Sequence, residues 1–283
     1  MVSLKISSDE LQSGQMTPEH LNAAVRAIEE DGFVILENVV DRAHLEILRE
    51  RMIADVRKIL ERPDAPFNWN TGNIQQQPPP FPPYLFRDVL VNDMVAAVVH
   101  AVLGPGVTNR AYTGNTALRS ETRQPVHADG VPTSGDEPPG PPDALVVNIP
   151  VVDMSAENGS TEIWPGTHRF TLPKGVANGI TIPEAYLEQR RQTVPPIQPT
   201  VACGSVIIRD MRVWHAGMPN RTDTPRPMIA LIPTIGEGGE EYAVVAPKGT
   251  ESYFEHPLLR WAVRFEEQPA DHIQHAHAYD YHP

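Results

Sequence analysis

The feature that most restricts the fold of this chain is a set of metal-binding residue types placed far apart in the sequence. His127 and Asp129 are separated by one residue, and side chains two residues apart in an extended segment point to the same side. A further candidate, His215, follows 86 residues after Asp129. Two imidazoles and one carboxylate occupy one face of an iron(II) ion and leave its other face open. The spacing therefore predicts a fold that brings a strand end and a second, distant strand around one metal.

A candidate anion-binding residue follows these three. Arg226 comes 11 residues after His215 and borders the apolar run 227–232. A guanidinium can bind a carboxylate through two parallel hydrogen bonds. A His-x-Asp triplet alone occurs often by chance. The alternative to a metal site is two buried histidines with a turn aspartate, and the alternative for Arg226 is an outward strand arginine paired with a surface acid.

Three motifs occur in one order along the chain. After His127–Asp129 come Asn158-Gly-Ser-Thr-Glu-Ile-Trp-Pro-Gly-Thr-His168 and Trp214-His-Ala-Gly-Met-Pro-Asn220, and Arg226 follows. In these motifs the chain resembles the phytanoyl-CoA dioxygenase family of iron(II)/2-oxoglutarate oxygenases. Three motifs in the same order are far more specific than any one of them.

The resemblance implies a role for each motif residue. His127, Asp129 and His215 would hold Fe(II), and Arg226 would bind the distal carboxylate of the co-substrate 2-oxoglutarate. Thr161 and Gln124 match positions that help to hold the co-substrate; ordinary strand or turn hydrogen bonding is the alternative for both. The implied reaction consumes dioxygen and oxidises a C–H bond of a small natural product, with release of succinate and carbon dioxide.

The negative net charge of the chain restricts the classes of molecule that it is expected to bind. The net charge is −13, four residues are lysine, and no basic cluster occurs, so nucleic acid and membrane surfaces are not expected partners. A CoA thioester carries several phosphate charges and would need a basic groove, which disfavours an acyl-CoA hydroxylase. A neutral or cationic small molecule is the expected substrate. A jelly-roll protein that binds a ligand or metal without turnover remains the alternative from another class.

Length and cysteine content predict a single cytoplasmic domain. A chain of 283 residues can bury a large core, and no apolar run approaches the length of a membrane span. The N-terminus lacks the apolar segment of a signal peptide. The one cysteine, Cys203, suits a reducing compartment. The oligomeric state stays open, a homo-oligomer included.

Periodicity predicts a mainly β fold with flanking helices. Helices are expected over 18–31, 41–60 and 93–104 and a short strand over 33–36, from caps and apolar spacing. Further strands are expected over 107–116, 120–127, 144–152, 204–209, 227–234 and 242–246. Such strands fit a cupin-like jelly roll, and the resemblance implies the same fold, a double-stranded β-helix. We expect residues 1–104 to form a helical buttress and mouth loop, 105–250 the jelly-roll core, and 251–283 a C-terminal segment.

Candidates for the substrate wall come from the mouth loop and the first core strand. They are Asn73, Tyr112, Asn115 and Arg119. The proline-rich loop 130–143 follows Asp129 directly and is expected to act as a lid. The histidine-rich segment from Asp271 lacks a carboxylate partner at fixed spacing, so we interpret it as solvated or as a cap on the barrel.

Overall fold

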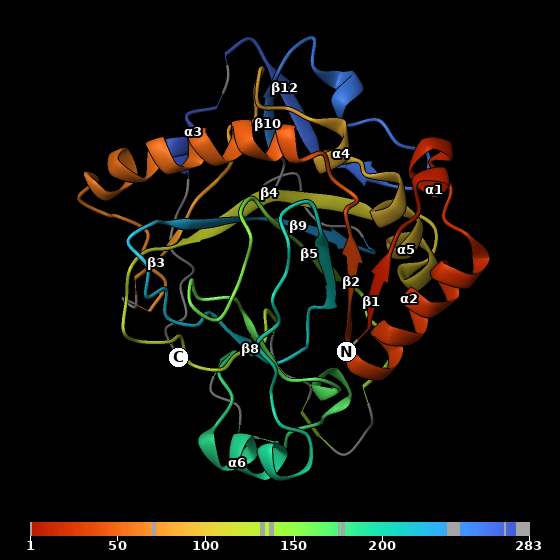
Figure 1. The fold of residues 1–283 in the computed structure, drawn as a ribbon, viewed down its shortest axis with the longest axis vertical. Helices are drawn as coiled ribbons and strands as arrows, with labels where there is room; N and C mark the ends of the chain where they lie inside the picture. The colour runs from red at the N-terminus through yellow and green to blue at the C-terminus, as the bar shows by residue number, and fades with distance from the viewer. Residues whose placement is uncertain are drawn as a thin grey trace.

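The protein is described by a computed structural model that covers residues 2–69, 72–130, 134–135, 139–174, 176, 179–236, 244–268 and 270–275. An eight-stranded sheet forms its centre (Figure 1). Its strands, in spatial order, are β1 (Ser3–Lys5), β2 (Phe33–Glu37), β7 (Val206–Asp210), β5 (Leu145–Pro150), β9 (Arg226–Thr234), β4 (Thr108–Ala117) and β11 (Arg260–Trp261), and β3 (Asn73–Gln75) also pairs with β4. Pairing from β2 through β7, β5 and β9 to β4 is antiparallel.

A second, smaller layer lies apart from this sheet. It contains β6 (Glu162–Ile163) and β8 (His215–Ala216), which pair antiparallel. Single bridges extend it through His127 to Thr181 on one side and through Ile163 to Ile197 on the other. Figure 1 shows β8 below the central sheet. Large and small sheets with helices outside confirm the predicted jelly roll. A further parallel pair, β10 (Val244–Pro247) and β12 (Val263–Glu266), lies at the opposite end.

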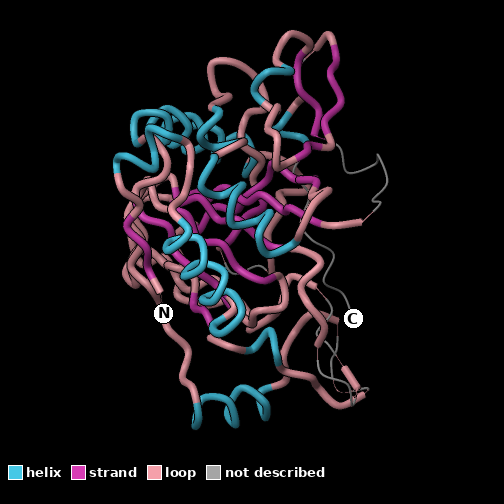
Figure 2. The backbone as a smooth tube through the Cα atoms, turned by 90° about the vertical axis from the view of Figure 1, so that its right-hand side faces the viewer, coloured by secondary structure: helices cyan, strands magenta, loops and turns pink. Residues whose placement is uncertain are grey.

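Helices cover the outer face of the large sheet. Figures 1 and 2 show them gathered on one side of the strands, except for one helix beyond β8. That exception is α6 (Glu184–Thr193). The others are α1 (Ser8–Ser13), α2 (Pro18–Asp31), α3 (Arg42–Leu60), α4 (Arg87–Leu90), α5 (Asp93–Leu103) and α7 (His272–His275). None of the helices in the described ranges is long and apolar enough to cross a membrane.

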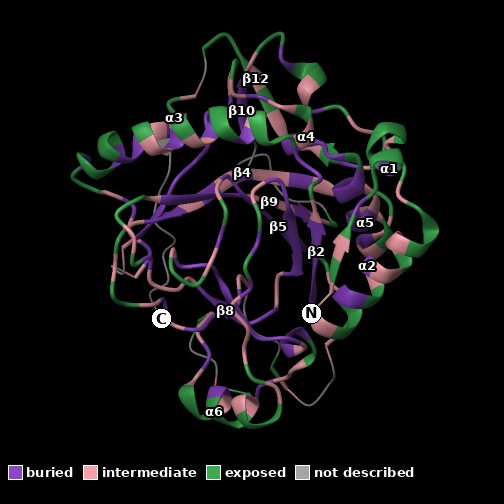
Figure 3. Ribbon diagram, viewed as in Figure 1, coloured by how far each residue is buried: buried purple, intermediate pink, exposed green. Residues whose placement is uncertain are grey.

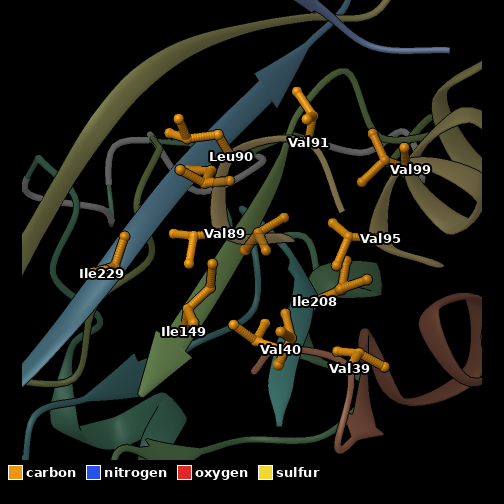
Figure 4. Packing of buried hydrophobic residues seen from close by; sticks show 14 of the residues in the cluster. Val39, Val40, Val89, Leu90, Val91, Val95, Val99, Ile149, Ile208 and Ile229 are labelled. Atoms are coloured by element: carbon orange, nitrogen blue, oxygen red, sulfur yellow. The ribbon is translucent and has the colours of Figure 1, made fainter. Parts of the chain in front are cut away.

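The main core lies between the large sheet and these helices. Strand residues alternate between two faces, and Ile149, Ile208 and Ile229 point outward against Val89 and Val95 of α4 and α5 (Figure 4). Figure 3 shows that the central strands are buried along most of their length, whereas the helices expose their outer sides. The other face of the sheet is therefore free to line an interior cavity.

The structure confirms most of the expected elements. The three predicted helices correspond to α2, α3 and α5, and four predicted core strands to β4, β5, β7 and β9. The expected strand over 120–127 is wrong: in this stretch only His127 forms a bridge. Pro125 has no N–H to donate, which disfavours a regular strand there. Part of the predicted lid, residues 131–133 and 136–138, lies outside the described residues, as do His277 and His282 of the C-terminal segment.

A buried glutamate near the N-terminus makes stability depend on pH. Burial alone would raise the pKa of Glu10, but hydrogen bonds from Thr17 and Ser7 outweigh burial and lower the pKa to about 2. A carboxyl whose pKa is depressed stabilises the fold above its unfolded pKa, near 4.5, and loses that contribution as the pH falls towards 2.

We therefore expect Glu10→Gln to lower the free energy of unfolding by about 2 kcal/mol at pH 7. The difference from the unsubstituted protein should shrink between pH 4.5 and the folded pKa near 2. Urea denaturation at a series of pH values measures it. Glu19→Gln, an exposed first-turn residue of α2, is the matched control and should change stability little at any pH.

Candidate metal centre

Two histidines meet across the small sheet. The backbone N–H of His127 donates to the carbonyl of His215 (2.9 Å), and the N–H of His215 donates back (2.8 Å). Residues that face one another in an antiparallel pair point to the same side. Their rings lie 4.3 Å apart between centroids. Asp129 follows His127 at the turn, so its carboxylate reaches the same point. The ligating atoms of all three residues lie within 4.8 Å of one another.

The backbone fixes which ring nitrogens can bind a metal. Nδ1 of His127 donates to the carbonyl oxygen of Pro125 (2.9 Å), and Nδ1 of His215 donates to that of Val213 (3.0 Å). A carbonyl oxygen only accepts, so each Nδ1 carries the hydrogen and each Nε2 keeps its lone pair. Both Nε2 atoms face Oδ1 of Asp129, at 4.0 and 3.5 Å.

Electrostatics keep these groups in the protonation states that a metal needs. Burial, reinforced by the neighbouring His215, lowers the pKa of His127 to about 3, so the ring is neutral at pH 7. Burial opposes ionisation of Asp129, but the Arg209 guanidinium and the two histidines outweigh it and hold the pKa of Asp129 well below its usual range. Two imidazole nitrogens and one carboxylate oxygen fit the donor set of non-haem iron(II).

Arg209, on β7, binds one of the two oxygens of the Asp129 carboxylate. Its Nη2 donates to Oδ2 of Asp129, and its Nε donates to Oδ1 of Asn148 (3.2 Å). The Arg209 side chain is 5% exposed. Because Oδ2 is bound to the guanidinium, Oδ1 is the oxygen directed at the two imidazoles. The arrangement favours one-oxygen ligation by Asp129.

Arg226 lies at the start of β9 and is 1% exposed. Its Nε donates to the carbonyl of Asn158 (3.2 Å), and its Nη2 donates to that of Gly159 (3.0 Å). In the described part of the chain no carboxylate pairs with it. Burial lowers the pKa of Arg226 to about 10, so the group stays cationic at pH 7. A buried, unpaired cation that lines a cavity is suited to bind an anionic ligand.

Glycine is required beside this arginine. Gly159 has φ +78°, and a Cβ there would lie 2.5 Å from the carbonyl oxygen of Met218. A side chain would therefore displace the turn whose carbonyls orient Arg226.

The three ligands and Arg226 line one cavity of about 140 Å³. Thr161 and Gln124 also line it. Oε1 of Gln124 accepts from the N–H of Gly217 (2.9 Å), which leaves its amide NH₂ for a ligand. The predicted co-substrate residues are therefore brought together around one space.

The four candidates for the substrate wall divide into two pairs. Asn73 and Asn115 line the cavity. Tyr112 does not: it is 2% exposed, packs in the outer core and contacts Trp261. Arg119 lies on the surface in an ion pair with Asp223. Tyr112 and Asn115 are three positions apart, and residues with odd spacing on a strand face opposite sides.

Sequence reasoning did not single out Arg209 or Asn148, which both line the cavity. Trp69 also lines it and comes from the segment expected to form the mouth loop. Trp69 lies against His127, with ring centroids 4.5 Å apart. For Arg209 a signal existed, since a charged residue interrupts the apolar run of residues 206–208 within a strand expected to be buried.

A model of the family described as phytanoyl-CoA dioxygenase (PhyH) matches residues 28–228, more than half of the chain. The chain belongs to the phytanoyl-CoA dioxygenase family. Family membership and the His127–Asp129–His215 donor set confirm the expected class, an iron- and 2-oxoglutarate-dependent oxidoreductase. The matched range includes all three candidate ligands and Arg226.

Solved structures share the fold. AviO1 from Streptomyces viridochromogenes Tue57 is 22% identical with a TM-score of 0.58, over 79% of this chain and 99% of that one. The epimerase SnoN, solved with Fe³⁺, alpha-ketoglutarate and nogalamycin RO, is 16% identical with a TM-score of 0.57, over 90% and 98%. The alpha-ketoglutarate-dependent carbocyclase SnoK from nogalamycin biosynthesis is 17% identical with a TM-score of 0.53, over 77% and 84%.

Proposed function

We propose that this protein uses iron(II), 2-oxoglutarate and dioxygen to oxidise a C–H bond of a small natural product, with release of succinate and carbon dioxide. One observation carries the proposal. Nε2 of His127, Nε2 of His215 and the Asp129 carboxylate converge in a cavity that also holds the buried guanidinium of Arg226, which pairs with no carboxylate in the described ranges. Iron(II) and 2-oxoglutarate, when bound, would activate dioxygen, which is the oxidant of both the co-substrate and the substrate.

The protein's own groups hold and orient the reactants. Nε2 of His127, Nε2 of His215 and Oδ1 of Asp129 would hold the metal. Arg226 would bind the far carboxylate of 2-oxoglutarate through two N–H groups, with the Thr161 hydroxyl beside it. A co-substrate held at Arg226 and at the metal position would leave the rest of the cavity to the substrate. The position of the substrate there then decides which of its C–H bonds reacts.

Natural-product tailoring is supported by similarity. SnoN and SnoK belong to nogalamycin biosynthesis. The sequence also resembles kanamycin B dioxygenase of aminoglycoside biosynthesis, in segments 114–115, 124–127, 157–162, 204–210 and 275–277. These similarities support the reaction type more strongly than the identity of the substrate, because a shared fold serves many substrates.

Metal removal tests the proposal. The protein treated with a chelator should form no succinate from 2-oxoglutarate, because the three ligands then hold nothing that can react with oxygen. Added iron(II) should restore slow succinate formation even without substrate, measured by chromatography under air. Zinc(II) should occupy the same ligands without restoring turnover. If iron binds but no succinate forms with any secondary metabolite tested, the non-catalytic binding protein becomes the better description.

A further inference from the structure

Carboxamides occupy two sides of the cavity. Asn73 on β3 and Asn115 on the adjacent β4 lie on one side, and Asn148 on β5 lies on the other. Asn115 forms no side-chain hydrogen bond within the described ranges. The side-chain oxygen of Asn148 accepts a hydrogen bond from Arg209, and that of Asn73 accepts one from the Asn68 amide (3.0 Å). The three NH₂ groups are therefore available to donate to a ligand, and the Asn115 oxygen to accept.

An apolar strip separates the two groups of amides. Met228, Ala230 and Ile232 alternate along β9 and line the cavity between β4 and β5. The register places Met228 opposite Asn115 and Ala230 opposite Asn148. A ligand that fits this surface needs a C–H face for the strip and polar groups along its edges.

The indole of Trp69 adds an aromatic surface at the metal side. Trp69 lines the same cavity and lies beside the ring of His127. An indole buries a large apolar area against a flat ligand face. Together with the amides, it favours a ring that carries hydroxyl groups around its edge and C–H bonds on its face.

The charges in the cavity oppose an ammonium group. Arg209 and Arg226 both line it, and Asp129 is the single carboxylate among the described lining residues. That carboxylate is already paired with Arg209 and directed at the metal position. A cationic substrate would find no acid to bind, because Asp129 is paired with Arg209 and Arg226 would face the co-substrate carboxylate, so an ammonium group would lose its hydration without gaining a charged partner. The cationic substrate that net charge alone allowed is therefore disfavoured within the cavity.

We propose that the substrate presents an uncharged polyhydroxylated ring, of sugar or cyclitol type, to this cavity and that Asn115 is a determinant of its specificity. The inference rests on the proposed function. The C–H face of the ring would lie on the β9 strip, and its hydroxyls would exchange hydrogen bonds with Asn73, Asn115 and Asn148. A site whose polar groups pair with hydroxyls discriminates strongly against an analogue that leaves them unpaired.

A pair of sugars that differ in one group tests the proposal. Methyl β-D-glucopyranoside and methyl 2-amino-2-deoxy-β-D-glucopyranoside are titrated into iron(II)- and 2-oxoglutarate-loaded protein under argon, and binding is measured by calorimetry. The hydroxyl sugar should bind about tenfold or more tightly than the amino sugar. Asn115→Asp places a carboxylate in the wall and should reverse that order. Asn73→Asp provides the same change from β3 if the first variant does not fold.

Asn22→Asp, at an exposed position on α2, is the matched control and should leave the preference for the hydroxyl sugar unchanged. Equal or tighter binding of the amino sugar by the unsubstituted protein, or no binding of either sugar in the millimolar range, would overturn the proposal. Succinate formation without substrate is measured separately. Absence of succinate from iron-loaded protein both without substrate and with every secondary metabolite tested would refute the proposed function, whereas its presence with an amine preference would refute only the substrate class.

Discussion

Replacing Asp129 with alanine is expected to reduce iron(II) affinity by more than about 100-fold, since even groups that only orient metal ligands contribute 10- to 100-fold. Asp129 supplies the one anionic donor of the set, since a histidine binds a metal as an uncharged imidazole. Its loss also leaves the Arg209 guanidinium buried without its carboxylate, which repels a cation. Both effects act in the same direction, so succinate formation should fall below detection.

Iron binding is measured by anaerobic titration and by metal content after desalting. The matched control is Asp223→Ala, because Asp223 also pairs with an arginine, Arg119, but its side chain is 85% exposed. This control should retain iron and turnover. Retention of stoichiometric iron by Asp129→Ala would show that the metal does not use this carboxylate.

The sequence indicated the candidate metal ligands because each of them lies in a short, recognisable motif. His127 and Asp129 are two residues apart, and His215 and Arg226 lie in or beside apolar strand sequences. Strand periodicity then fixes the direction in which each side chain points. The jelly roll was predictable for the same reason, because the apolar segments alternate with turn residues.

The candidate substrate wall was less predictable, because its residues come from several strands and the sequence alone does not reveal which strands pair. Asn148 and Arg209 lie on β5 and β7, and only the antiparallel register between these strands puts them in contact. Tyr112 was assigned to the wall by residue type, whereas its position on β4 turns it into the outer core. Short elements such as β3 and α6 are similarly set by tertiary contacts rather than by local propensity.

Replacing Arg226 with methionine is expected to raise the KM for 2-oxoglutarate by about 100-fold while iron affinity stays unchanged. The methionine keeps an apolar chain of similar shape but removes every N–H group that can meet a carboxylate. Arg226→Lys keeps the charge but not the planar pair of donors, so its KM should lie between the two. Because burial lowers the pKa of Arg226 only to about 10, the effect should be constant between pH 6 and 8.

A thermal readout separates anchoring of the co-substrate from a purely structural role for Arg226. A ligand stabilises the folded state in proportion to the logarithm of its concentration over its Kd, about 2.7 kcal/mol at 100 times Kd. Saturating 2-oxoglutarate should therefore raise the Tm of the iron-loaded protein but not that of Arg226→Met at the same concentration. Arg264→Met, an exposed arginine paired with Glu266, should respond like the unsubstituted protein. An equal ligand-induced rise in Arg226→Met would mean that another group holds the far carboxylate, and the cavity's second arginine, Arg209, would then be the residue to substitute next.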